Sequence, residues 1–406
     1  MNAGSGSARR TTGGDAAAAG DAQPGNGTGR PSPSESYSAF RRRAAEQATP
    51  LGRFRGRYDF ELDEFQVRAC RALQDGRGVL VAAPTGSGKT VVGEFAVELA
   101  LARGRKAFYT TPIKALSNQK YTDLVRRYGP EKVGLLTGDN TINGEAPVVV
   151  MTTEVLRNMV YARSSALREL SWVVLDEVHF LSDAYRGPVW EEVLIHTPPG
   201  VRFACLSATV SNAAELGDWI EALRGPTDTV VEHERPIRLD PLMMVGDRST
   251  EREHLVPLLV NGRPNPEGHR FDADRPTVRH GGPRGRVRSR FHTPRRVETI
   301  ERLREEDLLP TIYFIFSRNG CHEAANRYLD GGARLTGADE RRRIREIAAE
   351  RTRALTDAEL DVLGHDRWLA TLEHGVAAHH AGMIPAFRET VEQCFVEGLL
   401  KGVFAT

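Results

Sequence analysis

The sequence predicts an α/β protein built on a parallel sheet with helices on both faces, and three observations support this prediction. Short apolar runs rich in β-branched residues alternate with longer polar–apolar segments that are typical of helices. A glycine-rich loop, residues 83–90, joins the first apolar run to the next helical segment. The same alternation resumes in the second half of the chain, which predicts a second, smaller and incomplete α/β domain.

Composition describes an ordinary soluble globular protein of two or three domains, with 406 residues, 40% hydrophobic content and a net charge of +1. Near-neutral charge gives no overall basic surface for nucleic acid, although a groove can still be locally basic. The four cysteines are widely spaced and form no C-x-x-C pair, so we expect neither a disulfide framework nor a zinc site. With no apolar run long enough for a membrane span and no signal peptide, we expect a cytoplasmic protein that does not contact membranes.

Taken in order, the segments predict a tail, a complete domain, a linker and a partial domain. Residues 1–45 are rich in Gly, Ala, Ser and Pro with little to bury, so we expect a disordered tail. The first domain is expected over 58–243. Its strands are predicted at 78–83, 106–111, 147–153, 172–176 and 201–209.

Residues 244–296 are expected to be a linker, because their second part is dominated by Pro, Gly and Arg. The arginines between Arg270 and Arg296 could contact single-stranded RNA, but a solvated linker is the favoured interpretation. The second domain is expected over 297–406. Its strands are predicted at 311–317, at 375–382 and at the closing run 402–406, with helices near 318–326, 338–355 and 385–397.

The loop "APTGSGKT" predicts a phosphate-binding site. Backbone N–H groups can surround phosphate oxygens only where side chains do not intervene, which explains Gly86 and Gly88. Lys89 would reach the β- and γ-phosphates, and Thr90 would bind Mg²⁺ at the start of a helix. The alternative is a glycine turn that merely precedes a helix. The predicted nucleotide-binding residues of the loop are Pro84, Thr85, Gly86, Ser87, Gly88, Lys89 and Thr90.

Two carboxylates, Asp176 and Glu177, follow the apolar run "WVVL" at the end of a predicted strand, where ligands bind in parallel sheets. Asp176 would hold Mg²⁺ together with Thr90, and Glu177 would orient and deprotonate the attacking water. Adjacent carboxylates alone are common on protein surfaces. Combined with Lys89 upstream, they predict hydrolysis of a nucleoside triphosphate with Mg²⁺ as cofactor.

The sequence Asp176-Glu177-Val178-His179 resembles the DExH box of superfamily-two helicases, in which His179 would be part of the catalytic motif. Ser207-Ala208-Thr209 resembles the motif that couples the ATP site to nucleic acid. Phe60 and Gln66 resemble an adenine-recognition segment. Further blocks resemble superkiller-type, exosome-associated DExH RNA helicases, in particular actinobacterial relatives: "TPIKALSNQK" (111–120), "TGD" (137–139), "MTTEVLRNM" (151–159), "RGPVWEE" (186–192), "YFIFSRNGC" (313–321) and "HHAGMIPAFRETVEQCFVEGLLKGVFAT" (379–406).

This resemblance implies two tandem RecA-like P-loop NTPase domains, the second incomplete. It also implies an ATP-dependent RNA helicase that translocates 3′ to 5′ for RNA decay or processing, with RNA as partner and a ribonuclease as a further candidate partner. At strand ends and helix starts, hydroxyl, ammonium and N–H groups can grip phosphates without reading bases, although each could instead be a cap facing water. The candidate nucleic-acid contacts are Thr111, Pro112, Lys114, Gly138, Thr152, Thr153, Ser317, Arg318 and Thr406.

Two alternatives remain open. A DNA-repair helicase of the same superfamily is disfavoured by Ser117-Asn118-Gln119, where such enzymes usually carry an A-L-A-x-E-like run. A nucleotide-binding fragment that does not unwind nucleic acid is the other. The chain has no "Q-x-x-G-R-x-G-R" run, and its last residues "GVFAT" resemble the front half of an F-A-T-E-T motif. We therefore expect ATP and Mg²⁺ binding with little RNA-stimulated turnover by this chain alone.

The adjacent histidines His379 and His380 suggest a metal site at first sight. Neighbours on a strand point to opposite faces, however, so they cannot chelate one ion together. We expect a structural or coupling role for this pair.

Overall fold

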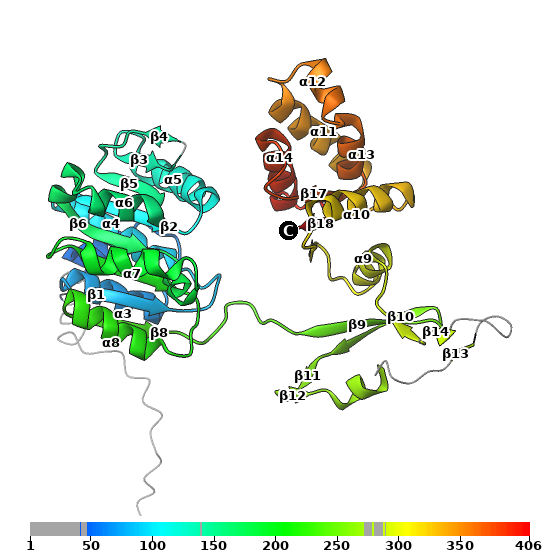
Figure 1. Ribbon diagram of the computed structural model, residues 1–406, viewed down its shortest axis with the longest axis horizontal. Coiled ribbons are helices and arrows are strands. Elements are labelled where there is room, and N and C mark those ends of the chain that lie inside the picture. Colours follow the sequence, from blue (N-terminus) through cyan, green and yellow to red (C-terminus); the bar gives the residue numbers. More distant parts are fainter. Residues whose placement is uncertain (1–40, 42–46, 139, 272–277, 280–286, 289) are drawn as a thin grey trace, which may run out of the picture. The chain divides into compact units, whose positions relative to one another are not determined.

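The computed structural model describes residue 41 and residues 47–138, 140–271, 278–279, 287–288 and 290–406 (Figure 1). The tail expected over 1–45 lies almost entirely outside the described residues. The chain divides into two compact units, Met1–Arg238 and Leu239–Thr406. Each unit contains a parallel sheet flanked by helices, so the predicted α/β class is confirmed.

The first unit is built on an eight-stranded sheet whose order is β4-β3-β5-β2-β6-β7-β1-β8. All neighbouring strands are parallel except β4, which runs antiparallel to β3. The strands are β1 Gly78–Ala82, β2 Lys106–Thr111, β3 Val133–Leu136, β4 Thr141–Ile142, β5 Val148–Thr152, β6 Leu170–Leu175, β7 Arg202–Ser207 and β8 Thr227–Val231. The helices are α2 Pro50–Arg55, α3 Glu64–Gln74, α4 Thr90–Ala102, α5 Lys114–Tyr128, α6 Thr153–Tyr161, α7 Gly187–His196 and α8 Ala213–Arg224, with short 3₁₀ turns η1 Ser165–Glu169 and η2 Val178–Ser182.

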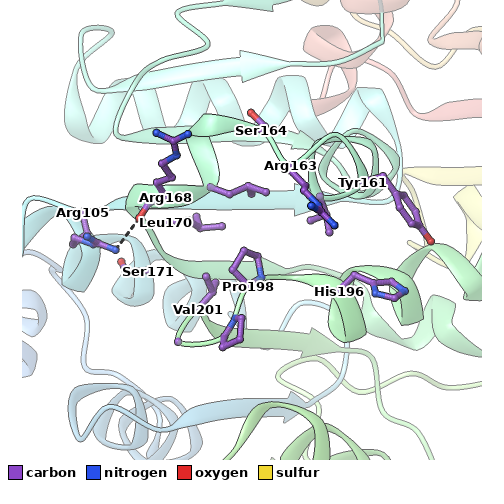
Figure 2. A pocket seen from close by; sticks show the side chains of 14 residues that line it. Arg105, Tyr161, Arg163, Ser164, Arg168, Leu170, Ser171, His196, Pro198 and Val201 are labelled. Atoms are coloured by element: carbon purple, nitrogen blue, oxygen red, sulfur yellow. Dashed lines mark hydrogen bonds between the residues drawn. The ribbon is translucent and has the colours of Figure 1, made fainter.

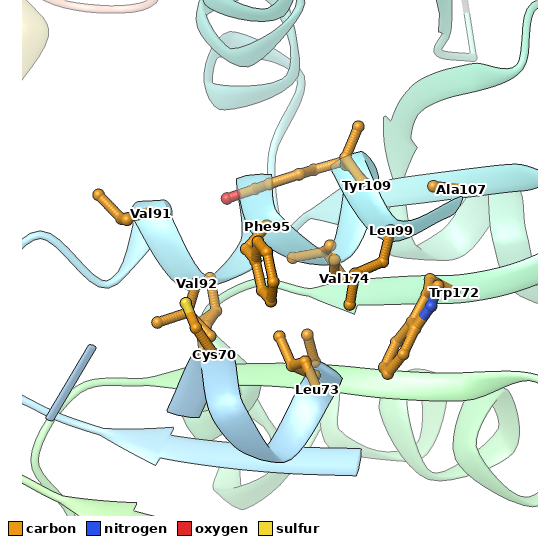
Figure 3. Close-up of a cluster of buried hydrophobic side chains, with 14 of the residues drawn as sticks. Cys70, Leu73, Val91, Val92, Phe95, Leu99, Ala107, Tyr109, Trp172 and Val174 are labelled. Atoms are coloured by element: carbon orange, nitrogen blue, oxygen red, sulfur yellow. The ribbon is translucent and has the colours of Figure 1, made fainter. Parts of the chain in front are cut away.

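Both faces of this sheet are buried, because successive residues along each strand point to opposite sides. On one face, Val79, Tyr109 and Val174 pack with side chains of α2, α3, α4 and α5. Figure 3 shows part of this cluster, including Trp172 from β6 and Leu73 from α3. The opposite face packs against α6, α7 and α8. The continuous apolar runs in the sequence follow from this two-sided burial.

The second unit begins with a small antiparallel sheet of order β10-β9-β15 rather than the linker expected over 244–296. Asp247 holds this sheet together: it is 2% exposed, and its carboxylate accepts two hydrogen bonds from the Arg290 guanidinium at 3.0 and 2.7 Å. These bonds hold the pKa of Asp247 well below its usual range. The Arg/Pro/Gly composition hid this strand pattern, and Arg290 is bound within the protein.

The elements of this region are β9 Leu242–Asp247, β10 Arg252–Pro257, β11 Leu259–Val260, β12 Arg263–Pro264, η3 Pro266–Phe271, β13 Val278–Arg279, β14 Val287–Arg288 and β15 Phe291–His292. The rest of the arginine-rich run, 272–277, 280–286 and 289, lies outside the described residues.

The remainder of the second unit is a parallel sheet of order β16-β18-β17, with the closing strand β18 at its centre. Helices α9 and α10 pack on one face around Phe404, and α11, α13 and α14 pack on the other around Val403. The elements are α9 Arg296–Glu305, β16 Thr311–Phe314, α10 Arg318–Asp330, α11 Ala338–Thr352, α12 Asp357–Val362, α13 His365–Glu373, β17 Val376–His379, α14 Pro385–Val396 and β18 Gly402–Ala405.

The four cysteines are all buried and unpaired. None of the helices that the structure describes combines the length and the apolar character needed to cross a bilayer. Within the same residues, no group of three or more His, Cys, Asp or Glu side chains is arranged to hold a metal ion.

The two adjacent histidines differ in their surroundings. His380 is 5% exposed; its Nδ1 accepts a hydrogen bond from the N–H of Gly382 at 3.2 Å, and its Nε2 lies 2.8 Å from Nε2 of His322. The accepting Nδ1 makes His380 neutral, with Nε2–H donating to His322. His379 instead meets Glu392, with 2.9 Å between Nε2 and Oε1. The two side chains therefore do not converge on one site.

This geometry predicts that acid destabilises the second unit. Burial, together with His322, Arg318 and His379, lowers the pKa of His380 below 6.5, so the unfolded chain binds the proton first. The stabilisation is complete above about pH 6.5 and is lost as the pH falls from there through the lower native pKa. Hydrogen exchange of peptides spanning 376–391, corrected for its intrinsic pH dependence, should show this loss. A His380→Gln variant should have a flatter pH profile, and an unchanged profile would contradict the assignment.

Candidate nucleotide and nucleic-acid site

The glycine-rich loop lies between β1 and α4, as predicted, at the carboxyl end of the central strands. Gly86 and Gly88 have φ values of +86° and +79°, which side-chain-bearing residues rarely adopt. A Cβ at Gly86 would meet nothing within 4 Å, so the loop surface there is open. Ser87 Oγ is buried and, among the described residues, has no hydrogen-bond partner. The loop therefore has open space beside Gly86 and a Ser87 hydroxyl that can still form a hydrogen bond.

Gln66 contacts this loop instead of facing open space. Its side-chain oxygen accepts from the N–H of Asp63 at 2.9 Å, and its Nε2 donates to the carbonyls of Ser87 and Gly88 at 3.3 and 3.1 Å. Gln66 is 3% exposed. In this structure both ends of its amide contact the protein, and Gln66 fastens the start of α3 to the phosphate loop.

Phe60, the other predicted adenine contact, is 53% exposed, with its ring centroid 5.0 Å from that of Tyr58. The Tyr58 hydroxyl donates to Glu94 of α4 at 2.7 Å, and Arg127 of α5 donates to both of them. Phe60 is thus held at the surface beside the helix that follows the loop, with a free aromatic face.

Asp176 and Glu177 follow β6, and the sheet order places β6 two strands from β1 with β7 between them. Asp176 Oδ1 accepts from the N–H of Glu177 at 3.0 Å, and Oδ2 accepts from the hydroxyl of Tyr109 at 3.2 Å. Burial, reinforced by the charge of Glu177, raises the pKa of Asp176, while Lys120 opposes the rise. Glu177 has φ +53°, ψ +45°, a left-handed conformation that costs a non-glycine residue free energy and is common at functional sites.

Two lysines reach this end of the sheet. The ammonium of Lys89 donates to the carbonyls of Ala83 and Pro84 at 2.7 and 2.9 Å, and its desolvation lowers its pKa. The ammonium of Lys120, from α5, donates to Oγ1 of Thr90 at 2.9 Å. The ammonium of Lys120 therefore contacts the first residue of α4, and that of Lys89 contacts the start of the loop.

His179 connects the carboxylates with the Ser207-Ala208-Thr209 segment. The N–H of Ala208 donates to Nδ1 of His179 at 3.3 Å, and the same nitrogen lies 3.2 Å from Oε2 of Glu177. Ser207 Oγ is buried without a hydrogen-bond partner among the described residues. One nitrogen of His179 therefore lies within contact distance of both Glu177 and the segment that follows β7.

These residues fit a nucleoside triphosphate with Mg²⁺. The hydroxyl of Thr90 and the carboxylates of Asp176 and Glu177 are the hard oxygen donors that Mg²⁺ prefers. The open loop at Gly86, the unused hydroxyl of Ser87 and the start of α4 suit phosphate oxygens.

The threonines expected to contact nucleic acid are mostly used inside the protein. Thr111 and Thr153 are fully buried; the hydroxyl of Thr111 lies 2.8 Å from Oγ of Ser117, and that of Thr153 donates to the carbonyl of Thr111 at 3.3 Å. Thr152 and Pro112 are also buried. Lys114 is exposed, and its ammonium lies beside Gly138, so these two positions from separate segments form one surface. Asp139, the last residue of "TGD", lies outside the described residues.

The predicted contacts of the second unit gather at the carboxyl edge of its own sheet, because β16, β18 and β17 run parallel. Ser317 caps α10, with its hydroxyl accepting from the N–H of Gly320 at 3.1 Å. Arg318 is exposed and lies beside Gly382. Thr406 follows β18, and its N–H donates to the carbonyl of His379 at 3.3 Å.

A separate pocket of 760 Å³ lies at the opposite end of the strands, near the start of β6 and just before β7 (Figure 2). Its charged lining consists of Arg105, Arg163 and Arg168, all exposed, with His196 and Tyr161 at its margin. Ligands of parallel sheets bind at the carboxyl ends of strands, so this pocket is not the nucleotide site.

Sequence reasoning missed Tyr109 and Lys120. Tyr109 is part of an apolar strand and reaches Asp176 only because β2 is the neighbour of β6, which the sequence does not reveal. Lys120 is one of several polar residues on α5, and nothing in the spacing of that helix marks it out.

Comparison with known proteins is consistent with this geometry. Residues 63–216 match the family model of DEAD/DEAH box helicases. The chain is 55% identical over 364 residues to the probable helicase HelY of Mycobacterium tuberculosis, covering 88% of this chain and 40% of HelY. It is 34% identical over 376 residues to the human exosome RNA helicase MTR4, covering 89% of this chain and 35% of MTR4.

It is also 38% identical over 370 residues to the human superkiller complex protein 2, covering 86% of this chain and 28% of that protein. The chain therefore spans 40% or less of the length of these relatives.

The geometry of the site predicts that a substitution of Glu177 reduces ATP hydrolysis without a comparable loss of ATP binding. Glu177→Gln keeps the shape of the site but removes the group that would accept a proton from water, so turnover should fall about 10²–10⁴-fold while ATP affinity changes little. Phosphate release and the binding of a fluorescent ATP analogue measure the two quantities. Glu191→Gln, an exposed position on α7, is the matched control. Equal turnover of parent and Glu177→Gln would exclude Glu177 as the base.

Proposed function

We propose that this chain is part of an ATP-dependent RNA helicase, because residues 63–216 match the family model of DEAD/DEAH box helicases and the chain is similar to HelY, MTR4 and superkiller complex protein 2. In this proposal, 58–243 and 297–406 act as two RecA-like domains that translocate 3′ to 5′ along RNA. A ribonuclease assembly is the proposed partner, and the cytoplasm, which suits four free cysteines, is the proposed location.

The observation that carries this proposal is the arrangement around the end of β7. The phosphate loop follows β1 on one side, the DExH segment follows β6 on the other, and His179 accepts the N–H of Ala208 between them. A protein that only bound nucleotide would need the loop and the carboxylates. The imidazole of His179, which accepts the N–H of Ala208 and lies 3.2 Å from Glu177, additionally supports contact between the proposed ATP site and the end of β7.

We propose the following division of roles. The amides of the phosphate loop and Lys89 hold the phosphates, and Thr90 and Asp176 hold Mg²⁺, which would neutralise phosphate charge when bound. Glu177 orients water and takes its proton. Because Lys89 donates to the carbonyls of Ala83 and Pro84, it must leave them to reach a phosphate.

RNA is the proposed polymer because the relative MTR4 is named as an RNA helicase. Lys114 beside Gly138 offers an exposed ammonium that can grip phosphate without reading bases. Arg318 and Thr406 offer a similar surface on the second unit, considered by itself. With the hydroxyls of Thr111 and Thr153 used internally, we propose that this strand end contributes its backbone rather than its side chains.

Nucleic-acid preference tests the proposal. Fluorescence anisotropy with single-stranded RNA and DNA of one sequence, in the presence of a non-hydrolysable ATP analogue and Mg²⁺, should give tighter binding to RNA. Equal or tighter binding to DNA would favour the repair-helicase alternative.

The same assay locates the contact. Lys114→Gln should weaken RNA binding regardless of sequence and reduce the slope of log affinity against log salt by about 1. Lys132→Gln, an exposed lysine outside this surface, is the matched control and should bind as the parent does.

A further inference from the structure

Lys120 occupies an unexpected place for a residue of α5. Its ammonium donates to Oγ1 of Thr90 at 2.9 Å and lies 5.9 Å from the centre of the Tyr109 ring. The Tyr109 hydroxyl in turn donates to Oδ2 of Asp176 at 3.2 Å. Lys120 therefore touches one of the two proposed magnesium ligands and is connected to the other through a single side chain.

Lys89 does not fill this role in the same structure. Its ammonium is directed to the carbonyls of Ala83 and Pro84, on the strand side of the loop. The ammonium of Lys120 also faces the ring of Tyr109, the residue whose hydroxyl donates to Asp176. Of the two lysines, Lys120 is therefore the one whose ammonium contacts Thr90, a proposed magnesium ligand.

We propose that Lys120 is a placeholder cation of the magnesium site: it holds Thr90 and offsets the charge of Asp176 when no metal is bound, and it leaves Thr90 when Mg²⁺ occupies the site. This inference rests on the proposed function, because it takes Thr90 and Asp176 as the metal ligands. A monovalent ammonium at this place repels a divalent ion, so Lys120 disfavours metal without nucleotide. The phosphates of a bound nucleotide add negative charge, which restores the attraction.

Because Lys120 belongs to α5, replacing its ammonium by Mg²⁺ at Thr90 would also affect how this helix is held. The same helix begins at Lys114, which lies beside Gly138 in the proposed nucleic-acid surface. The bond between Lys120 and Thr90 ties α5 to α4, the helix that follows the phosphate loop. When Lys120 leaves Thr90, this tie is released, so metal loading changes how the segment that bears Lys114 is held. Lys120 is accordingly a positioning residue.

The test is the affinity of the full chain for Mn²⁺ without nucleotide, measured by electron paramagnetic resonance of the free ion. Lys120→Met removes the competing charge and should tighten Mn²⁺ binding about tenfold. Lys120→Gln, a second neutral variant that can still bond Thr90, should also tighten it, and Lys120→Arg should bind as the parent does. Thermal unfolding of each variant shows whether it is folded.

Two controls identify the site. Lys132→Met should leave the affinity for Mn²⁺ unchanged. Adding Asp176→Asn to Lys120→Met should abolish the gain. Unchanged or weaker Mn²⁺ binding by both neutral variants would overturn the proposal.

Binding of a fluorescent ATP analogue in Mg²⁺ by the parent is measured in parallel. Failure of that binding would count against the proposed function, whereas intact ATP binding with no gain in Mn²⁺ affinity would count against Lys120 alone.

Discussion

The carboxylate of Asp176 is the constraint on which the rest of the site depends. It stands at the end of a buried strand, where desolvation penalises its charge and raises its pKa, and neighbouring donors and a cation oppose that penalty. The N–H of Glu177, the hydroxyl of Tyr109 and the ammonium of Lys120 supply these. A carboxylate in these surroundings attracts a divalent cation such as Mg²⁺. The phosphate loop, two strands away, can bind the nucleotide phosphates that accompany this cation.

The parallel sheet explains why these groups meet. Segments that follow β1, β6 and β7 come from positions far apart in the sequence, but their strands are neighbours and point the same way. The order places the Ser207-Ala208-Thr209 segment between the phosphate loop and the carboxylates. His179 can therefore contact both Glu177 and Ala208. Glu177, just before the turn that contains His179, has a left-handed backbone.

Much of this arrangement could be predicted from the sequence, and the exceptions have physical causes. Continuous apolar runs marked the strands because both faces of the sheets are covered, and the loop "APTGSGKT" marked its own position. Contacts between separate segments could not be predicted. Nothing local shows that Gln66 is fastened to Ser87 and Gly88, or that Lys120 reaches Thr90. Composition also misled: the arginine-rich run looked like linker, yet Arg290 pairs with Asp247 inside a small sheet.

The central claim is that Asp176 binds nucleotide-associated Mg²⁺, and one measurement tests it most directly. The affinity of a fluorescent ATP analogue is determined with Mg²⁺ and with a chelator, for the parent chain and for Asp176→Asn. The account predicts that Mg²⁺ tightens binding by the parent and has almost no effect on binding by the variant, which should remain folded because asparagine preserves the shape of the side chain. Equal tightening by Mg²⁺ in both proteins would contradict the account.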